Sequence, residues 1–153
     1  MIYKEEVRDL FEVPKEYHLA HCISADFGMG RGIAVEFNKR FNMKDTLQAK
    51  YPNYLNQWDN MGLVGECILE GRVFNLITKD RYFNKPTYKS MLQALREMQS
   101  LCWMYGINKI AMPVMGCGLD RLEWVEVRNT IKDVFKNDNI EILVCKQPNG
   151  DSK

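Results

Sequence analysis

The chain is poor in histidine, and its cysteines are neither paired nor clustered. It has two histidines and five dispersed cysteines, Cys22, Cys67, Cys102, Cys117 and Cys145, with no C-x-x-C spacing. This pattern argues against a cysteine and histidine metal site and favours reduced thiols. We therefore expect no metal and no cofactor in a cytoplasmic protein, with the nucleus as the other location if the chain is eukaryotic.

Long apolar runs and an excess of one charge are also missing. No run approaches the length that crosses a membrane, and the opening segment MIYKEEVRDLF lacks the apolar core of a secretory signal. The 21 basic and 20 acidic residues leave a formal charge of +1. We expect no membrane partner, and a nucleic-acid partner is not favoured, although a local basic patch is compatible with the sequence.

What is present fits one ordinary domain. The 153 residues are 46% hydrophobic and 27% charged, as in soluble globular proteins. We expect a monomer with a single domain over residues 1–147 and a flexible tail over residues 148–153.

Segments with strand patterns alternate with segments of helical periodicity. Gly71 separates two apolar runs and predicts a hairpin, whereas Pro86 and Gly106 bracket the longest helical pattern. Short helical turns or a surface excursion are expected over residues 43–60. The alternation predicts a layered α/β domain whose ligand lies beyond the carboxyl ends of the strands. The predicted strands cover residues 2–7, 17–23, 66–70, 73–78, 109–115 and 140–145.

Two glycine-rich loops each follow a predicted strand and precede a predicted helix. The first glycine loop spans residues 26–32 (DFGMGRG), and the second spans residues 115–120 (MGCGLD). Closely approaching backbone N–H groups and a helix N-terminus favour a phosphate or diphosphate. The spacing matches neither the dinucleotide fingerprint nor the P-loop, and tight turns without a ligand remain the alternative. Two such loops on one sheet edge favour a nucleotide diphosphate.

Three polar residues near these loops have structural explanations as well as chemical ones. Asp120, followed by Glu123, resembles a helix N-cap with a capping box. Lys79 stands at a strand exit, where a charged side chain is normally solvated. Cys117 has no partner base nearby in sequence and is expected to pack as a small buried residue. Spacing alone assigns none of the three to catalysis.

Taken together, these segments resemble the macrodomain family, in its terminal ADP-ribose protein glycohydrolase branch, the ALC1-like macrodomain subclass. The resemblance runs from about Val7 to Cys145. Its most specific parts are L-I-T-K (residues 76–79) and G-C-G-L-D-R-L (residues 116–122). The other matching segments are R-D-L-F (8–11), H-C-I-S (21–24), G-M-G-R-G-I-A (28–34), K-P-T-Y (85–88) and M-P (112–113). The resemblance implies a three-layer α/β/α macrodomain with a central mixed sheet flanked by helices.

The resemblance also implies roles for individual residues. Lys79 matches a lysine that attacks the anomeric carbon of the distal ribose, and Asp120 matches an aspartate that assists and then resolves the adduct. A lysine must be neutral to attack, which a dry cleft favours. Asp9 and Leu10 match the adenine site, although Arg8 replaces a common glycine and Cys145 an aromatic residue. The other residues that the resemblance places around ADP-ribose are Ser24, Gly30, Gly32, Ile33, Ala34, Thr78, Pro113, Gly116, Cys117, Gly118 and Leu119.

The implied function is hydrolysis of ADP-ribose esters, such as ADP-ribose linked to acidic residues of proteins or O-acetyl-ADP-ribose. Three alternatives stay open at this point: a reader that binds ADP-ribose without turnover, a hydrolase of ADP-ribose 1''-phosphate, and a hydrolase of ADP-ribosylated nucleic acid. The near-neutral charge disfavours the last, because nucleic-acid affinity comes largely from phosphate contacts.

Overall fold

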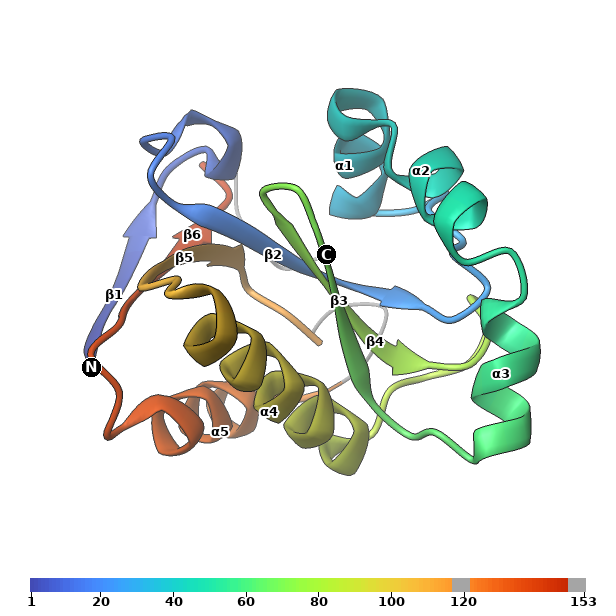
Figure 1. Cartoon of the computed structure of the whole chain (residues 1–153). Coiled ribbons are helices and arrows are strands. Elements are labelled where there is room, and N and C mark those ends of the chain that lie inside the picture. Colours follow the sequence, from blue (N-terminus) through green and yellow to red (C-terminus); the bar gives the residue numbers. More distant parts are fainter. Residues whose placement is uncertain (117–121, 149–153) are drawn as a thin grey trace.

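The core of the protein is one six-stranded mixed sheet in the order β1-β6-β5-β2-β4-β3 (Figure 1). The structure is a computed structural model and describes residues 1–116 and 122–148. Neighbouring strands run parallel, except that β3 is antiparallel to β4. The strands are β1 (Ile2–Val7), β2 (His18–Ser24), β3 (Glu66–Glu70), β4 (Val73–Lys79), β5 (Lys109–Pro113) and β6 (Glu141–Lys146).

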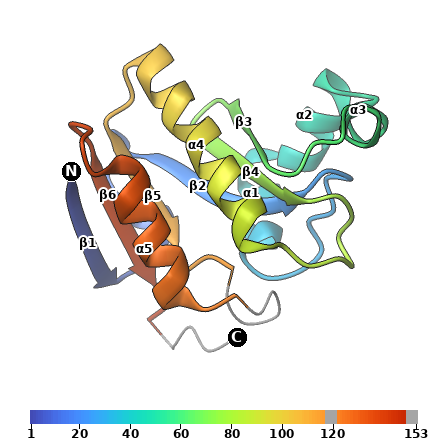
Figure 2. The same cartoon turned by 90° about the horizontal axis from the view of Figure 1, so that it is seen from below.

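Helices cover both faces of this sheet. One face packs against α1 (Ile33–Phe41), α2 (Met43–Lys50) and α3 (Tyr54–Met61), and the other against α4 (Tyr88–Tyr105) and α5 (Trp124–Phe135) (Figure 2). A short 3-10 helix, η1 (Leu10–Glu12), follows β1. The predicted three-layer α/β/α arrangement with a mixed sheet is therefore confirmed.

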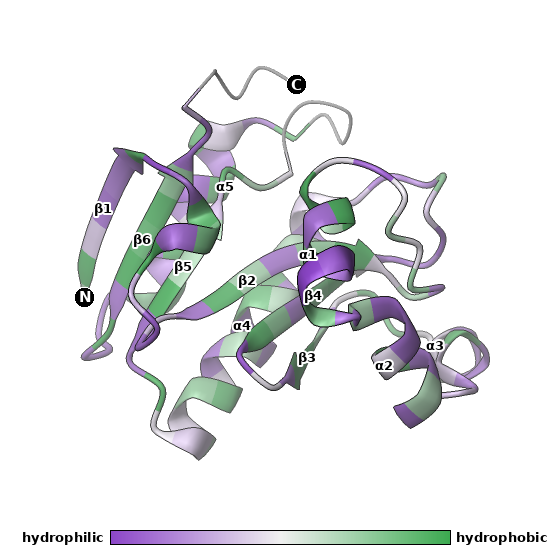
Figure 3. Cartoon of the chain, turned by 90° about the horizontal axis from the view of Figure 1, so that it is seen from above, coloured by the Kyte–Doolittle hydropathy of each residue, from purple (hydrophilic) through white to green (hydrophobic). Residues whose placement is uncertain are grey.

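Strand alternation divides the apolar side chains between two cores. On β4, Val73 and Ile77 join the core under α1, α2 and α3, whereas Phe74 and Leu76 join the core under α4 and α5. Because successive strand side chains point to opposite faces, a strand buried on both faces is apolar at most positions, and in β4 the buried exceptions are Asn75 and Thr78. The edge strand β1 differs, and it is largely purple in Figure 3 where the adjacent β6 is largely green.

The longest helix, α4, begins and ends as its sequence predicts. Thr87 accepts a hydrogen bond from the Ser90 N–H, and the Ser90 hydroxyl oxygen accepts one from the Thr87 N–H, which completes a capping box. Gly106 ends the helix in the left-handed conformation, with φ of 65°. The hairpin at Gly71 is also confirmed, because β3 and β4 pair in antiparallel register around it.

Of the two alternatives for residues 43–60, the structure has the helical one and not the surface excursion: the segment forms the short helices α2 and α3, and Met43, Leu47 and Trp58 are buried in the core. The helix that follows the second glycine loop, α5, begins at Trp124 with Glu123 as its N-cap, and Asp120 of the predicted capping box lies outside the described residues. The Tyr88 hydroxyl accepts a hydrogen bond from the Glu123 N–H at 3.0 Å, so a contact from α4 fixes this helix start.

Within the described ranges, no helix has both the length and the apolar character needed to span a membrane.

Candidate functional site

The parallel strands bring the predicted site residues to one edge of the sheet. Ser24 ends β2, Lys79 ends β4 and Pro113 ends β5, and these strands all run in the same direction. Their carboxyl ends therefore meet on one side of the domain, where open α/β sheets bind ligands.

The two central strands, β2 and β5, separate toward this edge. Their ladder joins His18 to Ile110 and Leu19 to Ala111, and among the described residues it goes no further. After β2 the chain goes on to β3 and β4 at one side of the sheet, and after β5 it goes on to β6 at the other, so the strand order reverses between β2 and β5. Such a topological switch point is the usual place of a ligand crevice in this fold class.

The first glycine loop leads from β2 into α1. Gly32 is the N-cap of α1 and has φ of 60° and ψ of −149°, a conformation that L side chains rarely adopt. Ile33 and Ala34 begin the helix, and the first N–H groups of a helix have no partner within it. Gly30 is exposed, and a Cβ atom there would meet nothing within 4 Å. The loop thus provides an open backbone and a helix N-terminus suited to an anion.

A β-bulge sets the position of Lys79. The β2–β4 register pairs Ile23 with Ile77 but Ser24 with Lys79, so Thr78 is an extra residue on β4. A bulge bends its strand and changes the direction of the following side chain. Thr78 and Ser24 are buried, whereas Lys79 is half-buried. The Lys79 carbonyl accepts a hydrogen bond from the Ala25 N–H at 2.9 Å. This bond connects the lysine to the residue that precedes the first glycine loop.

The residues predicted around adenine lie at the ends of β1 and β6. Asp9 is exposed, and its Oδ1 accepts a hydrogen bond from the Phe11 N–H at 2.9 Å, while Leu10 is buried. The Arg8 guanidinium pairs with the Glu6 carboxylate at 3.0 Å. Cys145 lies opposite Pro113 in the β5–β6 ladder, and burial raises the pKa of its thiol to about 11. This thiol is therefore neutral near pH 7.

Only the base of the second glycine loop belongs to the described residues. Gly116 has φ of 78°, and its carbonyl accepts a hydrogen bond from the Leu122 N–H at 2.6 Å. A Cβ atom at Gly116 would lie 3.1 Å from the Leu122 side chain, so this position leaves no room for a larger residue without adjustment. The candidate residues Cys117, Gly118, Leu119 and Asp120 lie outside the described residues.

A buried polar pair that the sequence did not single out joins β2 to β4. His21 Nε2 lies 2.7 Å from Asn75 Oδ1, and the imidazole stacks on Phe37 of α1 with centroids 3.8 Å apart. The Asn75 amide also donates to the Ile68 carbonyl of β3 at 3.3 Å. Burial lowers the pKa of His21 to about 4, so this histidine is neutral near pH 7. The pair supports the strands beneath the candidate site.

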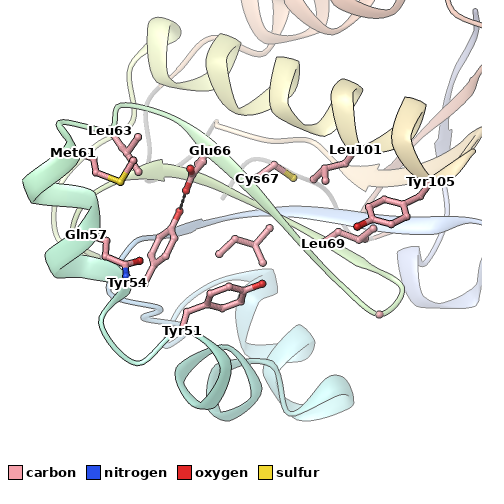
Figure 4. A pocket seen from close by; sticks show the side chains of 12 residues that line it. Tyr51, Tyr54, Gln57, Met61, Leu63, Glu66, Cys67, Leu69, Leu101 and Tyr105 are labelled. Carbon is pink, nitrogen blue, oxygen red and sulfur yellow. Dashed lines mark hydrogen bonds between the residues drawn. The ribbon is translucent and has the colours of Figure 1, made fainter.

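A cavity of about 500 Å³ lies elsewhere, beside the edge strand β3 and between α3 and α4 (Figure 4). Its lining includes Tyr51, Tyr54, Tyr105, Met61 and Leu63, with the carboxylate of Glu66. The Tyr54 hydroxyl donates a hydrogen bond to Glu66. Sequence inspection did not predict this cavity, and its apolar and anionic lining does not suit a diphosphate.

Among proteins of known activity, the chain is similar to two ADP-ribose glycohydrolases. It is 44% identical to ADP-ribose glycohydrolase OARD1 of Homo sapiens over 137 residues, which cover 89% of this chain and 86% of that protein. The Bos taurus OARD1 is 42% identical over the same shares of both chains. No family model matches the chain.

Solved structures with the same fold include bacterial macrodomains. The macrodomain of Thermus aquaticus DarG superposes with a TM-score of 0.75 at 21% identity and covers 95% of this chain and 98% of its own. The macrodomain of Mycobacterium tuberculosis DarG gives a TM-score of 0.76 at 18% identity, covering 95% and 99%. Because the shared fold is accompanied by 44% identity to a relative over most of both sequences, the chain belongs to the macrodomain family.

Proposed function

We propose that this protein is an ADP-ribosyl hydrolase that cleaves ADP-ribose ester linkages, with Lys79 as the nucleophile and Asp120 as the acid and base. The observation that carries the proposal is Lys79 itself, which leaves a bulged strand beside an anion-suited glycine loop. The 44% identity to a protein named ADP-ribose glycohydrolase supports the same activity.

The strand-end edge suggests how ADP-ribose lies in the site. We place adenine near Asp9 and Leu10, the diphosphate near residues 30–34 and 116–119, and the distal ribose near Ser24, Thr78 and Lys79. Ser24 and Lys79 are partners in the β2–β4 ladder, so the two residues lie side by side at this edge. The exposed Gly30 and the open N-terminus of α1 supply N–H donors for phosphate oxygens.

The proposed reaction has two steps. In the first step Lys79 Nζ forms a bond to the anomeric carbon of the distal ribose, and the bond from that carbon to the substrate carboxylate oxygen breaks. The carboxylate leaves with the electron pair, and Asp120 accepts the proton released from Nζ. Water then displaces Nζ from the anomeric carbon and gives ADP-ribose, while Nζ regains a proton. The step consumes one water and needs no redox partner.

Within the family we assign the chain to the ALC1-like subclass. The support is the pairing of L-I-T-K at residues 76–79 with G-C-G-L-D-R-L at residues 116–122. The lysine and the aspartate of the proposed mechanism both belong to these two segments.

A substrate panel with one mass measurement tests the proposal. We expect the wild type to release ADP-ribose from glutamate-linked protein and from O-acetyl-ADP-ribose faster than from ADP-ribose 1''-phosphate or a base-linked adduct. Removing the residue that resolves the adduct, in Asp120→Ala, is expected to leave a protein heavier by one ADP-ribose after incubation with the glutamate-linked substrate. If the wild type binds ADP-ribose tightly but forms no product, the hydrolase proposal fails and the protein is a reader that binds ADP-ribose without turnover.

A further inference from the structure

The carboxylate of Asp26 joins the first glycine loop to the segment that follows Lys79. Its Oδ1 accepts hydrogen bonds from the Gly28 N–H at 3.0 Å and from the Ser24 hydroxyl. Its Oδ2 accepts a third from the Tyr82 N–H at 3.0 Å. One side chain therefore connects three points of the site edge, and Tyr82 is 56 residues away in sequence.

Backbone contacts bring the same two segments together. The Ala25 N–H donates to the Lys79 carbonyl at 2.9 Å, and the Asp26 N–H donates to the Asp80 carbonyl at 3.2 Å. A Cβ atom on Gly28 would lie 3.0 Å from the Tyr82 Cβ and 3.2 Å from the Asp26 Oδ1. The contact is therefore so close that glycine alone fits at residue 28 without displacing a neighbour.

The turn between Asp26 and Gly28 has an unfavourable conformation that needs such support. Phe27 is buried and has φ of 60°, in the left-handed region that bulky residues seldom adopt. A residue held there costs about 1–3 kcal/mol, so neighbouring interactions must stabilise it. The bonds from Asp26 to Ser24 and Gly28 lie on either side of Phe27 and supply that stabilisation.

We infer that Asp26 is a positioning residue. It holds the first glycine loop and Lys79 at a fixed separation, and it sets the hydrogen-bonding role of Ser24. Because Ser24 donates its only hydroxyl proton to Asp26, its oxygen is left with the role of an acceptor toward any ligand, which suits a ribose hydroxyl. This inference rests on the proposed hydrolase function, since the residue being positioned is the proposed nucleophile.

Asp26→Asn separates two connections: the bonds of one carboxylate oxygen to Ser24 and Gly28 within the loop, and the bond of the other to Tyr82. The amide oxygen is able to keep the bonds from Ser24 and Gly28, but the amide NH₂ then faces the Tyr82 N–H, donor against donor. We expect ADP-ribose affinity within about threefold of wild type and kcat reduced by about 10- to 100-fold, because small misplacements of reacting groups cost rates of that order. In Asp26→Ala, where both connections are lost, affinity and kcat both fall.

Hydrogen–deuterium exchange gives a readout that does not depend on activity. Faster exchange is expected at the Tyr82 amide in Asp26→Asn, with the Gly28 amide still protected. Gly28→Ala keeps the carboxylate but forces the two segments apart, and it should reduce kcat in the same direction. Asp138→Asn serves as the stability control and should keep wild-type kcat. The Asp138 carboxylate follows α5 and accepts hydrogen bonds from Gln99 and Trp103 of α4.

Each result decides the inference. An Asp26→Asn protein with wild-type kcat, or with kcat and affinity reduced equally while Tyr82 stays protected, overturns the positioning role. If the wild type itself releases no ADP-ribose, the hydrolase proposal fails. In that case, faster Tyr82 exchange in Asp26→Asn with a retained Gly28 amide still supports the connection between the segments, and unchanged exchange at both amides refutes it.

Discussion

The carboxyl end of β4 presents a half-buried lysine beside a glycine loop and a helix N-terminus, whereas the flank of β3 presents tyrosine rings, aliphatic side chains and a carboxylate. The β3 flank holds a cavity of about 500 Å³. The strand ends hold the groups that a diphosphate needs, which are N–H donors and a favourable helix dipole. The comparison teaches that the charge and donor pattern of a region, and not its hollow volume, indicates which ligand it binds.

The largest expected effect comes from exchanging one lysine in each region. Lys79→Ala should reduce hydrolysis of glutamate-linked ADP-ribose at least about a thousandfold, because the loss of a nucleophile removes the covalent route. Lys50, which pairs with Glu70 at 2.9 Å on the β3 side, is the matched control. Lys50→Ala should leave kcat unchanged, and a comparable loss in both variants would break the comparison.

The next effect concerns the scaffold that connects the two regions. His21 has a pKa of about 4 when folded and about 6.5 when unfolded, so the unfolded state binds more protons between these values. The stability that neutral His21 contributes is fully present above pH 6.5. As the pH falls toward 4, the free energy of unfolding decreases by about 3 kcal/mol. Urea unfolding of wild type and His21→Leu at pH 7 and pH 4.5 measures this. Equal pH dependence in both proteins would contradict it.

A glycine exchange sharpens the comparison further. Gly32→Ala forces a side chain into φ of 60° at the start of α1, which costs about 1–3 kcal/mol, so the loop shifts and ADP-ribose affinity should fall about tenfold. Gly71→Ala places a side chain at φ of 58° in the β3–β4 hairpin. Calorimetry should show unchanged ADP-ribose affinity for this control, although it too lowers the melting temperature. Equal affinity in the Gly32 variant and the wild type would remove the loop from the site.

The smallest expected effect is in the cavity. Burial, and then the hydrogen bond to Glu66, raise the pKa of Tyr54, so its hydroxyl stays a donor across the accessible pH range. Tyr54→Phe removes that donor and should lower the free energy of unfolding by about 1 kcal/mol. ADP-ribose affinity should not change. A clear loss of affinity would show that the cavity and the strand-end site are coupled.

Much of the fold was predictable because its signals are local. The apolar run of β4, the Gly71 turn and the periodic face of α4 each depend on neighbours within a few residues. The start of α5 was not predictable for the opposite reason: its N-cap is Glu123, whose N–H donates a hydrogen bond to the Tyr88 hydroxyl, 35 residues away.

The features of the candidate site also fall into those that local sequence predicted and those that it did not. Glycine spacing predicted the first loop and its helix, and the family resemblance pointed to Lys79. The bulge at Thr78, the left-handed Phe27 and the connection from Asp26 to Tyr82 were not predictable, because each depends on pairing between β2 and β4 or on segments distant in sequence.

The sequence by itself determined the succession of strands and helices and the first glycine loop, since periodicity and backbone freedom are properties of short segments. Only the tertiary structure decided where β2 and β5 separate and where the cavity beside β3 forms. It also decided which residue connects the segment after Lys79 to the first glycine loop. These features arise from hydrogen bonds and packing between residues far apart in the chain, which no local pattern encodes.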